Sequence, residues 1–124
     1  MAEALAERRR ERERLLAQAR GYADRMAERI PVVAAAVVGS VARGDFNVWS
    51  DVDVVVVATH LPFRAPDRAS LLLADAPAGV QAVGFLPEEF EAAWRKGNPL
   101  VRETATDGVI LTGEDFFRRV VSGA

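Results

Sequence analysis

The segment VVGSVARGDFNVWSDVDVVVV, residues 37–57, places two aspartates at the head of an otherwise unbroken valine run. An apolar run of this length predicts a strand that is buried on both faces. Side chains alternate along a strand, so we expect Asp51 and Asp53 to face the same side, about 7 Å apart along the backbone. Two carboxylates in such a place cost free energy unless a cation or hydrogen-bond donors compensate them. The segment therefore predicts a bound positive charge beside Asp51 and Asp53.

A Gly-Ser step, Gly39-Ser40, comes before the aspartates at a predicted turn and helix start, and ten residues separate Ser40 from Asp51. Glycine lets the backbone approach a ligand closely, and the start of a helix offers N–H donors to an anion. Carboxylate oxygens spaced like those of Asp51 and Asp53 suit Mg²⁺, which keeps water and substrate phosphates among its ligands. A phosphate site beside such a carboxylate pair is typical of phosphoryl or nucleotidyl transfer.

The hydrophobic pattern predicts the elements around this segment. Apolar residues at helical spacing from Leu15 to Ile30 predict a long N-terminal helix over 1–30 that Pro31 ends, with fraying before Leu15. Strands are expected at 32–39, 51–57, 79–85 and 108–113, and further helices at 69–76, 87–97, 99–108 and 114–124. Strands that alternate with helices predict an α/β or α+β fold with one mixed sheet.

Composition and charge exclude several classes of protein. A chain of 124 residues predicts one domain over 1–124, and a net charge of −2 gives no general attraction to nucleic acid. Basic and acidic residues alternate over 6–20, which predicts a solvated helix face rather than a nucleic-acid site. The chain has no cysteine and no apolar segment of the ~20 residues that cross a bilayer. We therefore expect a cytoplasmic protein without disulfides and without a membrane anchor.

The stretch GSVARGDFNVWSDVD, residues 39–53, resembles the signature of the DNA polymerase beta-type nucleotidyltransferases, which is Gly-Ser, ten residues and Asp-x-Asp. The Ala-Arg-Gly step and the Ser-Asp-x-Asp ending are most similar to the small members called minimal nucleotidyltransferases. The resemblance covers roughly 32–113 and implies an α+β fold, a mixed sheet flanked by helices, with 32–113 as its core, 1–30 as an added helix and 114–124 as a closing helix.

The resemblance also implies roles for individual residues. Gly39 and Ser40 would bind the phosphates of ATP, and Asp51 and Asp53 would bind two Mg²⁺ ions and carry the catalysis. An acceptor would attack the α-phosphorus, and pyrophosphate would leave. Arg43 would either neutralise phosphate charge or form a structural ion pair, while the nearby Asp45 and Ser50 are expected to be turn or capping residues.

One part of the family pattern is altered. The family usually carries a third carboxylate on a later strand, and the matching position here is Gln81. A glutamine oxygen can bind a cation, but it cannot accept a proton as a carboxylate does. Asp75 is a possible substitute, although a plain surface role is the better prediction. Glu88 and Glu89 are explained by the helix start that they occupy.

Minimal members commonly act as antitoxins beside a small helical partner, a HEPN protein, by transferring AMP to a tyrosine of that partner. The resemblance therefore implies AMP transfer from ATP to a protein hydroxyl. The alternative is a weak or inactive antitoxin that only binds nucleotide or partner, which Gln81 favours and the intact pair Asp51 and Asp53 opposes.

Several apolar side chains have two interpretations. Trp49 could stack on a base, but packing over the sheet edge is the better prediction. Trp94 is expected to form a core stripe with Phe90. The stripe of Phe116, Phe117, Val120 and Val121 either packs on the sheet or is offered to another subunit.

Overall fold

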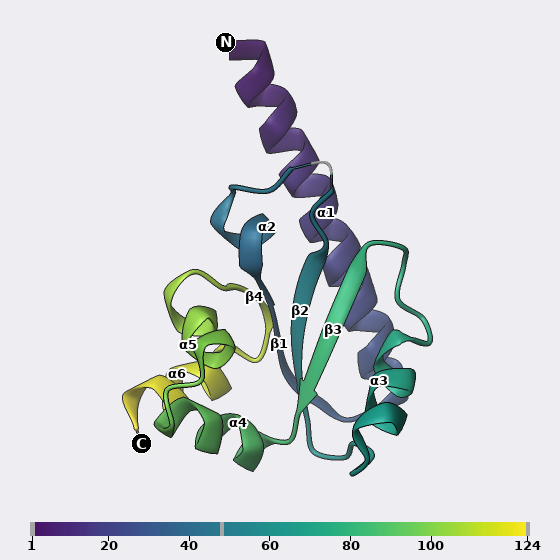
Figure 1. The fold of residues 1–124 in the computed structure, drawn as a ribbon, viewed down its shortest axis with the longest axis vertical. Coiled ribbons are helices and arrows are strands. Elements are labelled where there is room, and N and C mark those ends of the chain that lie inside the picture. Colours follow the sequence, from purple (N-terminus) through teal and green to yellow (C-terminus); the bar gives the residue numbers. More distant parts are fainter. Residues whose placement is uncertain (1, 48, 124) are drawn as a thin grey trace.

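The computed structural model describes residues 2–47 and 49–123, and Figure 1 shows the arrangement of their elements. In chain order the elements are α1 (Ala2–Arg29), β1 (Val32–Val38), α2 (Gly39–Arg43), β2 (Val52–Ala58), α3 (Ala65–Leu73), β3 (Val80–Phe85), α4 (Pro87–Arg95), α5 (Pro99–Thr106), β4 (Val109–Thr112) and α6 (Glu114–Ser122). Within the described ranges, no helix has both the length and the apolar character needed to span a membrane.

The strands form one mixed sheet in the order β3-β2-β1-β4. Strand β1 runs antiparallel to β2 and to β4, whereas β2 and β3 are parallel. The predicted α+β fold, with a mixed sheet flanked by helices and a long N-terminal helix, is therefore confirmed.

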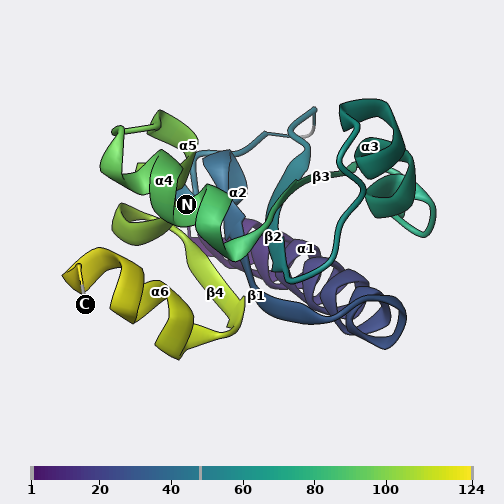
Figure 2. The same ribbon diagram turned by 90° about the horizontal axis from the view of Figure 1, so that it is seen from below.

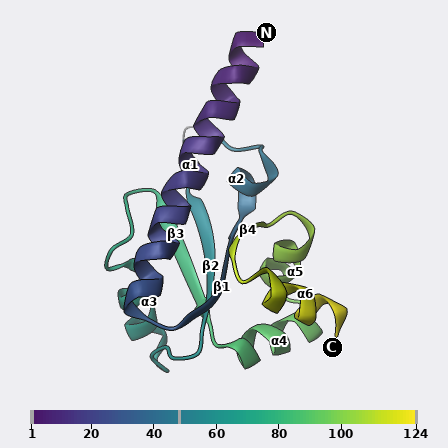
Figure 3. The same ribbon diagram turned by 180° about the vertical axis from the view of Figure 1, so that it is seen from behind.

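The valine run is buried on both faces of the sheet, as its sequence predicts. Val54 and Val56 face the core that contains Tyr22 of α1, whereas Val55 and Val57 face the core that contains Phe90 of α4. Figure 2 shows α1 and α3 on one side of the sheet and α4, α5 and α6 on the other, and Figure 3 shows α1 running along the back of the sheet. Successive side chains of β2 point to opposite faces of the sheet, so this one strand contributes to both apolar layers.

Helix α6 packs its aromatic stripe onto the sheet. Phe116, Phe117 and Val120 are at most 7% exposed, while Val121 is 48% exposed. Phe116 and Phe117 lie with Phe90 in the core beneath α4–α6, with ring centroids 5.5–5.7 Å apart. Of the two interpretations of this stripe, packing on the sheet is the correct one for all but Val121.

Helix α3 begins four residues earlier than the sequence predicts. It starts at Ala65, and Pro66 lies in its first turn. Proline is tolerated there because the first N–H groups of a helix have no intrahelical partner. The loop after β2 is therefore shorter than a helix start at residue 69 implies, and Pro66 lies at the start of the helix.

The N-terminal half of α1 contacts both α2 and the segment that follows it. The sequence instead predicts fraying and a solvated face for this half of α1. Arg12 donates hydrogen bonds to the carbonyls of Val41 and Ala42 at 2.9 and 2.7 Å. Arg8 donates to the carbonyl of Phe46 at 2.5 Å and lies over its ring, 4.6 Å from the centroid. The contacts of Arg12 satisfy carbonyls at the end of α2 that have no helical partner.

We expect Arg12→Ala to lower the free energy of unfolding by about 1–3 kcal/mol, because it leaves two partly buried carbonyls without their charged donor. Urea denaturation of the variant measures this loss. Arg10→Ala, the same change at an exposed position of the same helix, is the matched control. Equal stability of the two variants would show that the Arg12 contacts do not hold this segment.

Candidate functional site

The residues of the Gly-Ser and Asp-x-Asp motifs meet at one end of the sheet. Gly39 directly follows β1, and Asp51 directly precedes β2. In the antiparallel pair Asp53 lies opposite Val38, which is the last residue before Gly39. Chain reversal between β1 and β2 therefore brings the two motifs together, as the strand–turn–strand pattern predicts (Figure 1).

The backbone of Gly39 lies against the carboxylate of Asp53. A Cβ atom added to Gly39 would lie 2.6 Å from Oδ2 of Asp53, closer than any ordinary contact. The φ angle of Gly39 is +78°, a conformation that side chains rarely adopt. Two independent constraints therefore require glycine here, and together they leave the Asp53 carboxylate beside the start of α2.

The electrostatic surroundings of Asp53 favour its neutral form. Partial burial raises the pKa of this carboxyl, the carboxylates of Asp51 and Glu103 raise it further, and the guanidinium of Arg43 opposes them. A cation bound by Asp51 and Asp53 would remove this cost, so the oxygen ligands at this end of the sheet fit a hard divalent ion.

Glu103 of α5 is a site residue that the sequence analysis missed. Its Oε1 accepts the backbone N–H of Gly39 at 3.0 Å, although 64 positions separate the two residues. The same oxygen forms an ion pair with Arg43, which also pairs with Asp45 at 3.2 Å. Of the two roles considered for Arg43, the structural ion pair is present. The helix pattern of 99–108 carries no signal that marks Glu103.

The register of β3 places Gln81 beside Asp53, as the sequence predicts. The two residues are Cα partners in the parallel pair, and Gln81 is exposed. Among the described residues, no group of three His, Cys, Asp or Glu side chains could hold a metal ion. Asp75 is no substitute for a third carboxylate here, because it pairs with Arg29 at the end of α1. The site therefore offers two aspartates, one amide and Glu103.

The turn before Asp51 shows one correct and one wrong prediction. The Oγ of Ser50 accepts the backbone N–H of Asn47 at 2.9 Å, so Ser50 is a turn residue as expected. Trp49 is 89% exposed, so the prediction that it packs over the sheet edge is wrong. Together with Arg8 and Leu15 of α1, Trp49 instead lines an open groove of about 670 Å³.

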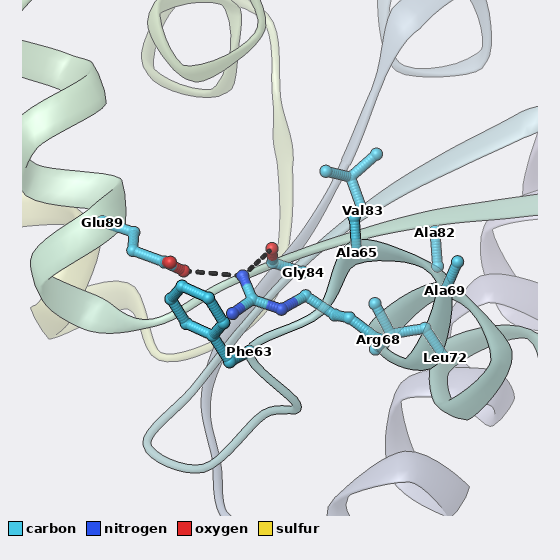
Figure 4. A pocket seen from close by; sticks show the side chains of 9 residues that line it. All are labelled: Phe63, Ala65, Arg68, Ala69, Leu72, Ala82, Val83, Gly84 and Glu89. Carbon is cyan, nitrogen blue, oxygen red and sulfur yellow. Dashed lines mark hydrogen bonds and ion pairs between the residues drawn. The ribbon is translucent and has the colours of Figure 1, made fainter.

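A separate hollow of about 370 Å³ lies between α3, β3 and the start of α4, and Figure 4 shows the side chains that line it. Arg68 crosses this hollow and pairs with Glu89 at 2.7 Å. Glu89 also accepts the N–H of Leu86 at 2.7 Å, which confirms its predicted place at a helix start. The two charged side chains of this hollow, Arg68 and Glu89, pair with each other. Neither Gly39 nor the aspartates line it. The hollow is therefore a poorer candidate for a functional site than the end of the sheet that carries the two motifs.

We expect Gly39→Ala to lower the free energy of unfolding by about 2–4 kcal/mol, because a left-handed backbone angle costs about 1–2 kcal/mol and overpacking adds about as much. Thermal denaturation gives the loss. Gly97→Ala is the matched control: its φ is +75°, yet no described atom lies within 4 Å of its Cβ position. The loss of unfolding free energy in Gly39→Ala beyond that in Gly97→Ala measures the close contact with Asp53. Equal losses in the two variants would contradict that contact.

Two solved structures share this fold. One is a candidate nucleotidyltransferase from Sulfolobus solfataricus, with a TM-score of 0.63 and 19% identity over 83% of this chain and 84% of that chain. The other is a toxin–antitoxin structure with AMP-PNP, with a TM-score of 0.56 and 20% identity over 84% of this chain and 85% of that chain. At these identities the likeness shows the fold alone.

Comparison by sequence gives the family. No curated protein matches the chain. A model of the nucleotidyltransferase domain, however, matches residues 19–99, which include both motifs and Gln81. Since this match spans more than half of the 124 residues, the chain belongs to the nucleotidyltransferase domain family.

Proposed function

We propose that the protein is a Mg²⁺-dependent nucleotidyltransferase that transfers AMP from ATP to a hydroxyl of a partner protein. The contact between the Gly39 backbone and the Asp53 carboxylate carries this proposal, because it puts phosphate donors next to metal-binding oxygens. We further propose that 1–124 is a single nucleotidyltransferase domain that acts in the cytoplasm, where ATP and Mg²⁺ are available.

Asp51 and Asp53 would hold two Mg²⁺ ions, with water, the phosphates and the amide oxygen of Gln81 as further ligands. Bound there, the metal supplies positive charge to the phosphate oxygens during transfer. Folding leaves the Asp53 carboxyl with a raised pKa beside Asp51, so this pair gains more from a cation than two solvated surface carboxylates would.

The backbone N–H of Gly39, Ser40 and the guanidinium of Arg43 would bind the triphosphate. The acceptor oxygen forms a bond to the α-phosphorus, the bond from this phosphorus to the bridging oxygen breaks, and pyrophosphate carries away the electron pair. The hydroxyl proton goes to water, because the amide of Gln81 cannot accept it. Water is a weaker base than a positioned carboxylate, so we expect slow transfer.

The proposed acceptor is a tyrosine of a small helical HEPN-type toxin, with this chain as the antitoxin. Support comes from the shared fold with a toxin–antitoxin structure that contains AMP-PNP and from the exposed position of Asp51 and Gln81 at the open end of the sheet. An acceptor delivered by a second protein needs no large pocket in this chain.

A second candidate function is neutralisation of the partner by contact, with nucleotide bound but not transferred. The observation that favours it is Gln81 beside Asp53, where the family pattern has a carboxylate. The two functions share the nucleotide site and differ in whether AMP leaves it.

The test is purification of the tagged chain from the organism that encodes it, followed by incubation of the eluate with Mg²⁺ and ATP labelled at the α-phosphorus. We expect a co-purifying small helical protein to acquire the label, and the variant Asp51→Asn with Asp53→Asn to transfer none. Retained nucleotide without a labelled protein would favour neutralisation by contact. A chain that always purifies alone and does not bind ATP would overturn both functions.

A further inference from the structure

Glu103 occupies the donors that the proposed function assigns to a phosphate. Its Oε1 accepts the N–H of Gly39 at 3.0 Å and pairs with the guanidinium of Arg43. The Glu103 side chain is 25% exposed and that of Arg43 is 40% exposed, so both can be reached from solvent. A carboxylate oxygen and a phosphate oxygen are alike as anionic acceptors of backbone and guanidinium N–H groups.

The N–H of Gly39 cannot serve both anions at once. The backbone of Gly39 has a single N–H group, and in this structure that group points to Glu103. The carboxylate of Glu103 also acts on Asp53, whose charge it disfavours. With Glu103 still in place, a triphosphate bound at Gly39 would lie beside three carboxylates, those of Asp51, Asp53 and Glu103. The negative charges of the phosphates and of Glu103 would repel each other.

We propose that Glu103 is an internal substitute for a phosphate group: it holds the Gly39 N–H and Arg43 in position before ATP binds and is displaced by the triphosphate. This inference rests on the proposed function. Glu103 is in this account a positioning residue that lowers the affinity for nucleotide and keeps the α2 start ordered, and it does not touch the reacting atoms.

The contacts of Glu103 distinguish this role from that of a third metal ligand. Among the described residues, Glu103 does not combine with Asp51 and Asp53 into a group that could hold a metal ion. Its Oε1 instead faces two hydrogen-bond donors, Gly39 and Arg43. A metal ligand and a phosphate substitute predict opposite effects on nucleotide affinity, so a single substitution separates them.

The test is calorimetric titration of the full chain with ATP in excess Mg²⁺. Glu103→Gln keeps the shape and the acceptor for Gly39 but loses the charge, so we expect ATP to bind about fivefold more tightly, on the order of the difference between charged and neutral hydrogen bonds. Glu103→Ala removes the acceptor altogether and should also bind more tightly, which keeps the test valid if one variant folds poorly. Glu88→Gln, an exposed position on α4, is the matched control and should leave the affinity unchanged.

An amide NMR spectrum tests the displacement itself. Adding ATP to the natural chain should move the Gly39 amide resonance, because its acceptor changes from the Glu103 carboxylate to a phosphate, whereas a Glu103 with a purely structural role would keep this hydrogen bond. If the natural chain binds ATP and neither Glu103 variant binds it more tightly, the inference is overturned and the proposed function stands. If the natural chain does not bind ATP at all, both are overturned.

Discussion

Replacing both aspartates, Asp51→Asn with Asp53→Asn, should abolish Mg²⁺-dependent binding of ATP. Triphosphate and carboxylates repel each other unless a cation lies between them, and asparagine is a much weaker ligand for Mg²⁺ than a carboxylate is. Calorimetric titration with ATP, with and without Mg²⁺, measures the effect. The natural chain should need the metal, and the double variant should show no response to it.

The same variant should be at least as stable as the natural chain without Mg²⁺. Folding raises the pKa of Asp53, so folding disfavours the ionised form of this carboxyl, and its contribution to stability falls as the pH rises through the raised pKa. Asparagine removes this cost.

Asp24→Asn with Asp107→Asn, two exposed positions, is the control and should bind ATP normally. Unchanged Mg²⁺-dependent affinity in the Asp51 and Asp53 variant would contradict the assignment of these residues to the metal.

Gln81→Glu should raise the rate of AMP transfer by tenfold or more. The substitution puts a proton acceptor beside Asp53, its Cα partner on β2, and general-base assistance is worth roughly 10²–10⁴ in rate. Single-turnover transfer to the purified partner measures the change. Without Mg²⁺ the variant should be less stable, because a third carboxylate then joins Asp51 and Asp53 on one sheet end. Gln18→Glu makes the same charge change on α1 and should leave the rate unaltered.

Two other results would change the interpretation of Gln81. If the natural chain transfers AMP rapidly and Gln81→Glu transfers it more slowly, Gln81 does not stand in the place of a catalytic carboxylate. If neither form transfers AMP while both bind ATP, the protein neutralises its partner by contact.

Local patterns in the sequence predict the sheet and the meeting of the Gly-Ser and Asp-x-Asp motifs at one end of it. Val54 and Val55 are both buried and face opposite layers, as the period of a strand predicts, and the register that joins Asp53 to Gln81 follows from counting along β3. These features depend on residues near one another in the chain, or on a sheet geometry with few alternatives.

Contacts between a side chain and a distant backbone could not be predicted. Arg12 reaches the carbonyl of Val41, and Glu103 reaches the N–H of Gly39, across 29 and 64 positions. A charged residue on an amphipathic helix looks the same in sequence whether it faces water or a backbone group. The early start of α3 has a different cause, since Pro66 is compatible both with a loop and with the first turn of a helix.

The most direct test of the account is a crystal structure of the chain with Mg²⁺ and an ATP analogue that cannot be cleaved between the α- and β-phosphorus. We predict metal density bound by the carboxylates of Asp51 and Asp53, a phosphate oxygen on the N–H of Gly39, and the carboxylate of Glu103 displaced from that group. Metal and phosphates bound elsewhere, with Glu103 still on Gly39, would contradict the proposed site.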